Sequence, residues 1–328
     1  MINNKSSLLF NRMADPKQKV LEMPELPKVS VLIPTYNYAH YLDEAIESIL
    51  QQTYQNFEVI IVDDNSTDDT DATVKKYLAD SRFLYYKNTV NIGLAENFNM
   101  CLQYASGKYI KYLLADDKFH PLLLDTYVNV MEANKNISLI TSSRQIFGIK
   151  NCIKQPPLLY LQSGKKVITE TLKDGQGNWI GEPSAVMFRK ADLRVGGFNT
   201  QFTCFVDWDM WLRLLTVGDC YILPEVLSYF RVHEKQASKV LARDHRYTFE
   251  DYMFYKCIWQ KNVYNIELSK IDIETIVKKK AAYCAKAMYR ALFAFYKKNN
   301  YSIFWAGFKI ALKERVFFKP LISFYNNI

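Results

Sequence analysis

Short apolar runs alternate with amphipathic segments through the first third of the chain. The runs are rich in β-branched and aromatic residues and predict buried strands at 29–33, 57–62, 82–86 and 109–114. The segments between them predict helices at 41–53, 71–78 and 94–105. Pro34 is expected to end the first strand, because proline cannot donate a hydrogen bond to a sheet. Strands and helices that alternate at this spacing indicate parallel βαβ units.

Polar residues stand at the carboxyl ends of three of these strands. Tyr36 follows the first strand, Asp64 the second, and the pair Asp116 and Asp117 the fourth. Ligands of open α/β sheets bind beyond the carboxyl ends of the strands, so these side chains are expected to line one site. The chain has neither of the glycine-rich phosphate motifs, G-x-G-x-x-G and G-x-x-x-x-G-K-[ST]. A nucleotide here would therefore be held through a metal ion and through contacts to its base and ribose.

Asp116 and Asp117 are adjacent carboxylates at the end of a buried strand. Two like charges this close disfavour each other unless a cation neutralises them. Mn²⁺ or Mg²⁺ takes carboxylate and phosphate oxygens together, which predicts a metal that holds a diphosphate. The alternative is a solvated turn in which an Asp caps the helix that begins near Pro121.

Three stretches together resemble family 2 glycosyltransferases of the GT-A fold: Val29–Asn37, Phe57–Thr70 and Tyr109–Pro121. The resemblance covers residues 28–240, with Asn91-Ile-Gly-Leu as a further marker. It implies an α/β, Rossmann-like GT-A fold with a mainly parallel central sheet flanked by helices. It also implies a nucleotide-sugar donor at the strand ends, with five nucleotide-binding residues: Pro34, Tyr36, Asp64, Asn91 and Asp116.

The family's metal motif is usually Asp-x-Asp, and here Leu114 stands at its first position. The resemblance leaves Asp117 as the expected direct ligand of Mn²⁺ or Mg²⁺. The segment Tyr229–Ser238 is similar to the family's Tyr-Arg-x-His segment. It implies that His233 reaches back to the metal and that Arg231 contacts phosphate.

The second half of the chain supplies the expected sugar site. The segment Asn178–Lys190 resembles the strand that closes this site in the family. Five residues are therefore expected to line the donor sugar or the acceptor: Trp179, Gly181, Glu182, Pro183 and Ser184.

The segment Phe205–Leu215 resembles the family's Glu-Asp-x-Asp stretch, with Val206 in place of Glu. Asp207 then falls where an inverting transferase carries its general base. Such a base takes the proton of the attacking hydroxyl as an oxocarbenium-like transition state forms. Asp209 is the competing candidate, and Asp207 can also serve as a plain helix N-cap.

The chain is divided into three regions by these patterns: a flexible leader at 1–27, a catalytic domain at 28–240 and a helical, basic and aromatic region at 241–328. Helices are predicted at 247–259 and 273–296. Residues 270–328 hold twelve Lys and Arg against three acids, whereas the rest of the chain sums to −1. A basic amphipathic tail suits the face of an anionic membrane. It could equally form a cap on the catalytic domain or an oligomer contact. No nucleic-acid reader motif accompanies the charge, so nucleic-acid binding is not expected.

Composition is that of an ordinary globular protein, with 49% hydrophobic and 23% charged residues in 328. The six cysteines form no C-x-x-C pair and indicate reduced thiols. No apolar signal segment or spanning stretch is apparent. The expected location is the cytoplasm, or the inner face of the membrane as a peripheral protein.

The expected activity is that of an inverting, metal-dependent transferase. It would move a sugar from a nucleoside diphosphate, a uridine one by preference, to a hydroxyl of a surface glycan or a lipid-linked acceptor. The motif Gln-x-x-Arg-Trp of processive synthases is absent, so one transfer per encounter is expected. The alternative is a non-catalytic protein of the same fold that binds nucleotide-sugar or glycan as a scaffold. The departures at Leu114 and Val206 keep that alternative open.

Overall fold

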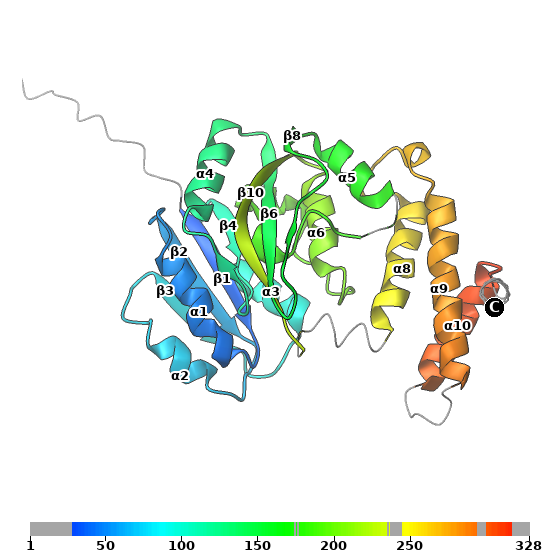
Figure 1. Ribbon diagram of the computed structural model, residues 1–328, viewed down its shortest axis with the longest axis horizontal. Helices are drawn as coiled ribbons and strands as arrows, with labels where there is room; N and C mark the ends of the chain where they lie inside the picture. Colours follow the sequence, from blue (N-terminus) through cyan, green and yellow to red (C-terminus); the bar gives the residue numbers. More distant parts are fainter. Residues whose placement is uncertain are drawn as a thin grey trace, which may run out of the picture.

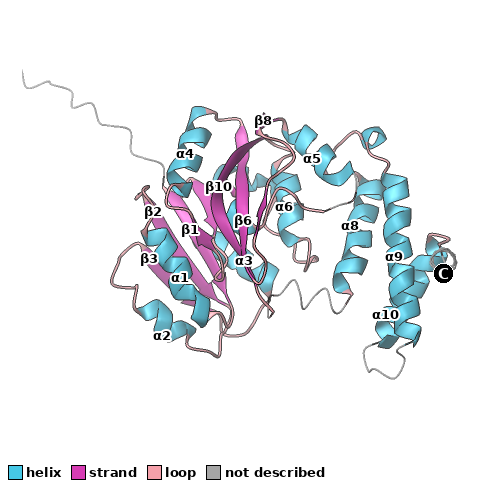
Figure 2. Cartoon of the chain, viewed as in Figure 1, coloured by secondary structure: helices cyan, strands magenta, loops and turns pink. Residues whose placement is uncertain are grey.

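The computed structural model describes residues 28–173, 175, 177–234, 236, 245–293 and 300–316. The predicted leader at 1–27 lies outside these residues. Within them, helices cover both faces of one mixed, mostly parallel sheet, and further helices extend from one side (Figures 1 and 2). The predicted fold class, an α/β sheet flanked by helices with a helical C-terminal region, is confirmed.

The first half forms the predicted βαβ units. Its strands are β1 (Val29–Thr35), β2 (Phe57–Asp63), β3 (Phe83–Lys87) and β4 (Tyr109–Tyr112). The helices between them are α1 (Ala39–Leu50), α2 (Thr70–Lys75) and α3 (Leu94–Tyr104). β1 lies between β2 and β4 and is parallel to both, and β3 follows outside β2. The carboxyl ends of these four strands therefore meet at one edge, as predicted.

The expectation that Pro34 ends the first strand is wrong. β1 continues through Pro34 to Thr35, which pairs with Asp63 of β2. The Thr35 carbonyl accepts from Asp64 N on the β2 side, whereas the Leu32 carbonyl accepts from Leu113 N on the β4 side. Pro34 is two residues after Leu32, so its nitrogen faces the β4 side as well. β4 ends before it reaches this position. The missing N–H thus faces a side where no ladder hydrogen bond is needed.

The second half adds six strands: β5 (Lys118–Phe119), β6 (Ile137–Gly148), β7 (Cys152–Lys154), β8 (Tyr160–Gln162), β9 (Met187–Arg189) and β10 (Asp219–Val232). The sheet order is β3-β2-β1-β4-β9-β6-β10-β5, with β7 on β6 and β8 on β10. β9 is antiparallel to both β4 and β6. It therefore joins the parallel first half to the long parallel pair of β6 and β10.

The helices of this half are α4 (Leu123–Ala133), α5 (Gly164–Lys173) and α6 (Val206–Leu214), with short 3₁₀ turns η1 (Pro183–Ala185) and η2 (Lys190–Val195). Alternate strand residues pack on opposite faces of the sheet. Ile33 and Ile61 pack with α1 and α4, whereas Leu32 and Ile60 pack with α3 and α6. Strands that are buried on both faces read as continuous apolar runs, which is why the sequence reveals them.

The C-terminal region consists of α8 (Arg246–Lys261), the turn η3 (Leu268–Lys270), α9 (Ile273–Phe293) and α10 (Asn300–Lys313). The helices predicted at 247–259 and 273–296 correspond to α8 and α9. Phe254 and Tyr255 of α8 are buried in the same apolar cluster as Trp208 of α6. α8 therefore covers the catalytic domain, and the division at residue 240 stays a prediction. Among the described residues, no helix has both the length and the apolarity needed to cross a membrane.

Candidate active site

A cavity of about 440 Å³ opens at the carboxyl ends of β1, β2 and β4. Its wall brings together predicted residues from distant parts of the chain: Pro34, Tyr36, Asp64, Asn91, Asp116, Glu182, Pro183 and Asp207. The predicted nucleotide-binding set thus lines one cavity with the expected base. Tyr38 and Gln236 also line this wall, and the sequence analysis missed both.

Tyr36 and Asp64 both line the cavity, but the Tyr36 side chain is exposed and the Asp64 side chain is buried. The Tyr36 side chain is 45% exposed, which leaves its ring available to a ligand. The Asp64 carboxylate is buried and accepts hydrogen bonds from Ile92 N at 2.8 Å and Gly93 N at 2.9 Å. Asn91 Nδ2 donates to the Asp64 carbonyl at 3.2 Å. Asp64 therefore holds the loop before α3 against the strand end, in addition to facing the cavity.

The two carboxyls that follow β4 point in different directions. Asp116 lines the cavity, and its Oδ2 lies 3.0 Å from His233 Nε2. Asp117 lies behind it: Oδ2 accepts from Ser184 Oγ at 2.6 Å and Oδ1 accepts from Arg231 N at 2.9 Å. Burial raises the pKa of both carboxyls, and the Asp116 charge raises the pKa of Asp117 further.

This carboxyl pair fits a divalent cation that is shared with a phosphate. Among the residues that the structure describes, no group of three His, Cys, Asp or Glu stands close enough to hold a metal unaided. A cation would compensate the buried charges of Asp116 and Asp117, and phosphate oxygens would complete its coordination. Asp116 faces the cavity, whereas both oxygens of Asp117 already accept hydrogen bonds. The predicted metal roles of Asp117 and His233 stay predictions, and the geometry favours Asp116 for direct contact.

Arg231 is not among the residues that line the cavity, and its predicted phosphate contact stays a prediction. Its Nε donates to the Asp116 carbonyl at 2.8 Å, and its guanidinium pairs with Glu44. The guanidinium carbon also lies 4.6 Å from the Tyr41 ring centre and 4.3 Å from that of Phe147. The arginine therefore fastens β10 to the Asp116 backbone and to α1. That contact pattern supports a positioning role.

Lys111 of β4 is fully buried near the Asp117 charge and was not predicted from the sequence. Its Nζ donates to the carbonyls of Ser184 at 2.5 Å and Tyr112 at 3.1 Å. It also lies 4.4 Å from the centre of the Phe119 ring. Burial lowers the pKa of Lys111 well below its usual range, while the Asp117 charge opposes this shift. A lysine in an otherwise apolar run was the available signal.

Only part of the predicted sugar segment lines the cavity. Glu182 and Pro183 line the cavity, whereas Trp179, Gly181 and Ser184 do not. The Gly181 carbonyl accepts from Trp211 Nε1 at 3.0 Å. At φ +134° a side chain at Gly181 would be strained, and a Cβ would come within 2.9 Å of Ala185 Cβ.

Glu182 pairs with Arg144 of β6, a buried residue that the sequence analysis also missed. Arg144 Nη1 lies 3.5 Å from the Trp179 carbonyl, which it approaches as a donor. The Arg144 guanidinium thus fixes both ends of the turn before η1. This contact holds the Glu182 carboxylate at the cavity wall.

Asp207 stands in the first turn of α6, and its carboxyl faces the cavity. Its Oδ1 accepts from Trp208 N at 2.7 Å, and Asn178 Nδ2 lies 3.4 Å from Oδ2. Burial raises the pKa of Asp207 to about 7, and the nearby Glu182 charge adds to the shift. A carboxylate with such a pKa can accept a proton near neutral pH.

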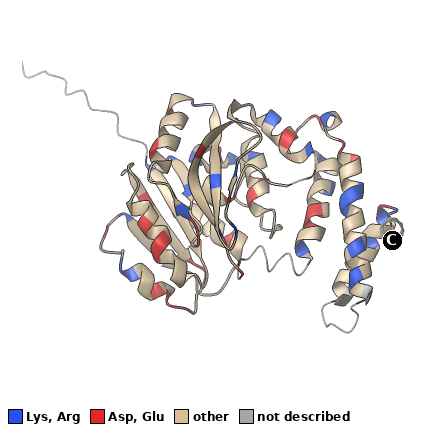
Figure 3. Cartoon of the chain, viewed as in Figure 1, with Lys and Arg blue, Asp and Glu red and all other residues tan. Residues whose placement is uncertain are grey.

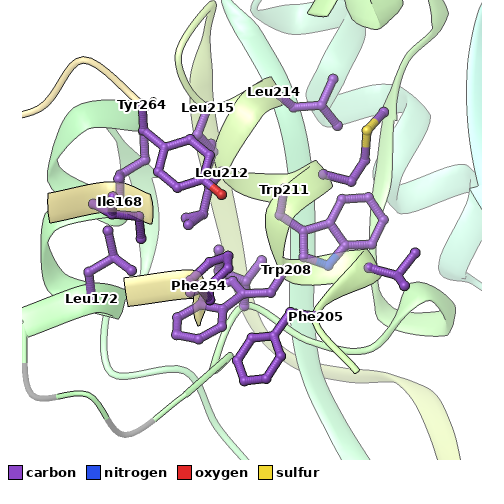
Figure 4. Packing of buried hydrophobic residues seen from close by; sticks show 14 of the residues in the cluster. Ile168, Leu172, Phe205, Trp208, Trp211, Leu212, Leu214, Leu215, Phe254 and Tyr264 are labelled. Atoms are coloured by element: carbon purple, nitrogen blue, oxygen red, sulfur yellow. The ribbon is translucent and has the colours of Figure 1, made fainter. Parts of the chain in front are cut away.

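An aromatic cluster and a carboxylate from α8 hold this helix start in place. Trp208 stacks on Phe254 with ring centres 4.9 Å apart, and Phe205 stacks on both (Figure 4). The Glu250 carboxylate accepts from Thr203 N at 2.6 Å and from Phe205 N at 3.2 Å. The C-terminal region therefore positions the predicted base.

Asp209, the competing base candidate, is committed elsewhere. Its Oδ2 accepts from Arg213 Nε at 2.9 Å, and its Oδ1 accepts from Tyr264 OH at 2.8 Å. It is buried and does not line the cavity. Of the two acids, only Asp207 has the placement that proton transfer to a bound ligand requires.

Residues 30–196 match the family described as Glycosyl transferase family 2. The match spans half of the chain, and the chain belongs to this family. It is thus a glycosyltransferase that uses nucleotide-sugar donors. An uncharacterized glycosyltransferase of Haemophilus influenzae is 29% identical over 271 residues, which cover 77% of this chain and 79% of the relative.

Solved structures share the fold at low sequence identity. S. aureus TarS 1-349 in complex with UDP-GlcNAc has a TM-score of 0.59 at 17% identity, covering 85% of this chain and 79% of that chain. The mannosyltransferase PcManGT from Pyrobaculum calidifontis, in complex with GDP-Man and Mn²⁺, has a TM-score of 0.53 at 18% identity, covering 88% and 87%. These likenesses confirm the predicted GT-A fold.

Proposed function

We propose that the protein is an inverting transferase that moves a sugar from a nucleoside diphosphate to a hydroxyl of a glycan or lipid-linked acceptor. The observation that carries the proposal is the single cavity wall shared by Tyr36, Asp116 and Asp207. These residues provide an aromatic face for a base, a carboxylate for the diphosphate side and a base for the acceptor. A uridine donor is supported by the fold shared with TarS in complex with UDP-GlcNAc.

Asp207 is the general base in this proposal. Its carboxylate receives the proton of the acceptor hydroxyl while the oxygen of that hydroxyl bonds to the anomeric carbon. The bond from the anomeric carbon to the diphosphate oxygen breaks at the opposite face, so the anomeric configuration inverts. Asn178, which approaches Oδ2, keeps the carboxylate turned toward the cavity.

Asp116 provides the cavity-facing oxygen for a divalent cation, with His233 behind it. When bound, Mn²⁺ or Mg²⁺ neutralises the charge that develops on the departing diphosphate. The PcManGT complex with GDP-Man and Mn²⁺ supports this part of the proposal. Glu182 lies where it can accept from sugar hydroxyls, and Arg144 prevents it from turning away.

Nucleotide release from UDP-, GDP- and dTDP-sugars tests the proposal, with Mn²⁺, with Mg²⁺ and with EDTA. We expect metal-dependent release from one donor. The variant Asp207→Asn should lower it by about 100-fold or more, since general base catalysis contributes about that much. Asp69→Asn, which removes an exposed charge beside α2, is the matched control and should leave release unchanged.

A non-catalytic scaffold of the same fold is the second candidate. The absence of a carboxylate at Leu114 is the observation that favours it. The scaffold predicts that UDP-sugar binds, that no donor is consumed with any acceptor fraction, and that Asp207→Asn changes nothing measurable. Donor consumption that Asp207→Asn abolishes would eliminate it.

A further inference from the structure

We propose that the outward face of α10 docks on an anionic lipid bilayer, with the basic stripe of α9 adding long-range attraction. This inference goes beyond the proposed function and does not depend on it. It concerns a surface remote in sequence from the cavity wall. Three expectations stood for the C-terminal region: a membrane contact, a cap and an oligomer contact. α8 forms the cap, and we assign the exposed face of α10 to the membrane contact rather than to the oligomer contact.

The outward face of α10 combines exposed apolar and basic side chains at helical spacing. Trp305, Lys309 and Leu312 recur at intervals of four and three residues, which places them on one side of the helix. Trp305 is 53% exposed and Leu312 is 56% exposed. Lys313 adds a second exposed cation beside Lys309. Helices that lie in the interface of a bilayer present such a mixture of large apolar and basic side chains.

The opposite face of α10 is fixed against α9. Gly307 is buried, and a Cβ there would come within 2.6 Å of Met288 Cβ and 2.7 Å of the Cys284 carbonyl oxygen. The two backbones therefore approach as closely as a glycine allows. Ala311, one turn further, is also fully buried. Because this side is packed, Trp305 and Leu312 must point away from the protein.

The α9 helix adds a basic stripe, visible as repeated blue residues in Figure 3. Lys279 and Arg290 are exposed and lie on one side of the helix, with half-buried Lys286 between them. Two acids of the region, Glu274 and Glu314, have partners outside this stripe. Glu274 lies 2.5 Å from Lys278, and Glu314 is directed inward to Lys256 at 2.8 Å.

The chemistry of this surface favours a bilayer over a protein groove. A contact between the same faces of two copies would bring Lys309 and Lys313 of each copy together, and these like charges would repel. Phospholipid headgroups provide dispersed negative charge, and the interface accommodates a tryptophan ring with its apolar body inward. Each Lys or Arg near an anionic surface adds to this attraction. An enzyme docked in this way would meet lipid-linked acceptors at the bilayer.

Vesicle flotation with the full chain tests this inference. The probes are vesicles of phosphatidylcholine alone and of phosphatidylcholine mixed with phosphatidylglycerol. We expect binding to the mixed vesicles, weaker binding at high salt, and little binding to phosphatidylcholine. Lys309→Glu combined with Lys313→Glu should weaken binding to mixed vesicles by at least about 10-fold. Trp305→Ala should weaken it as well, with thermal unfolding measured to show that each variant is folded.

The matched control is Lys165→Glu combined with Lys166→Glu on α5, where both lysines are exposed. It changes the net charge by the same amount and should retain binding. Equal loss in both double variants would overturn the inference, because binding would then follow net charge alone. Absence of binding to mixed vesicles would overturn it as well. So would conversion of a dimer to a monomer by Trp305→Ala in ultracentrifugation, which would assign the face to a second copy.

Discussion

Ser184 Oγ donates a hydrogen bond of 2.6 Å to Asp117 Oδ2, across 67 positions of sequence. Ser184 Oγ also accepts from Leu114 N at 3.0 Å. The turn that carries Glu182 is thereby fastened to the segment after β4, which carries Asp116. The expected metal side and the expected sugar side of the cavity therefore form one hydrogen-bonded unit. Lys111 Nζ adds a further hydrogen bond between β4 and this turn, because it donates to the Ser184 carbonyl.

Lys111→Met should disturb this unit. The substitution leaves the carbonyls of Ser184 and Tyr112 without their buried donor, which costs about 1–3 kcal/mol of the free energy of unfolding. We expect urea denaturation to show this loss and donor KM to rise as the turn loosens. Lys108→Met removes a partly exposed pair with Glu132 and a contact of 5.5 Å with the Tyr109 ring centre, and a surface pair contributes about 0–1 kcal/mol. Equal effects of the two substitutions would contradict the role of Lys111.

Tyr36→Ala should weaken donor binding without changing stability. The ring is 45% exposed at the cavity wall, so its loss removes little buried area. If it stacks on the nucleotide base, its removal costs about 1–3 kcal/mol of binding free energy. Calorimetric titration with UDP measures this, and Tyr36→Phe should bind as the wild type does. Tyr160→Ala, at a site that is 57% exposed and outside the cavity wall, should bind UDP normally.

The catalytic rate should rise with pH through the pKa of Asp207. Burial raises this pKa to about 7, and the base must be deprotonated to accept a proton. We therefore expect kcat/KM to be low at acidic pH and to level off on the alkaline side of neutrality. A profile that stays flat down to the ordinary carboxyl range would show that another group takes the proton.

The same carboxyl should make folding stability depend on pH. Between an unfolded-state pKa of about 4 and the folded-state pKa of about 7, the folded protein binds more protons at Asp207 than the unfolded chain does. The contribution of Asp207 is therefore fully present at low pH and is lost as the pH rises through about 7. Asp207→Asn should flatten this part of the stability profile, whereas Asp69→Asn should not. Chemical denaturation at several pH values measures the difference.

Much of the first half could be predicted from the sequence, because strands buried on both faces produce continuous apolar runs. The convergence of Tyr36, Asp64 and Asp116 followed from parallel topology alone. The extension of β1 through Pro34 did not, since it depends on where β4 ends. The antiparallel insertion of β9 between β4 and β6 also has no local signal.

The sequence does not reveal which way each side chain points, and therefore which of the predicted residues face the cavity. Asp207 and Asp209 are two residues apart, yet only the first faces the cavity. Arg231 and Asp117 lie in the predicted segments, but neither lines the cavity, and both carboxylate oxygens of Asp117 accept hydrogen bonds within the protein. Arg144 was missed because its partner, Glu182, lies 38 positions away, and no pattern along the chain joins them.

We expect the cavity to take a nucleoside diphosphate together with a divalent cation. Calorimetric titration of UDP into the wild type, with Mn²⁺ and then with EDTA, tests this expectation most directly, with Asp116→Asn and Asp207→Asn alongside. We expect UDP to bind with Mn²⁺ and to bind at least about 10-fold more weakly with EDTA or in Asp116→Asn, because the cation offsets the charge of the diphosphate. Asp207→Asn should bind UDP as the wild type does. Binding that neither EDTA nor Asp116→Asn changes, or no binding of UDP or GDP under any condition, would show that the cavity does not bind a diphosphate through a cation at Asp116.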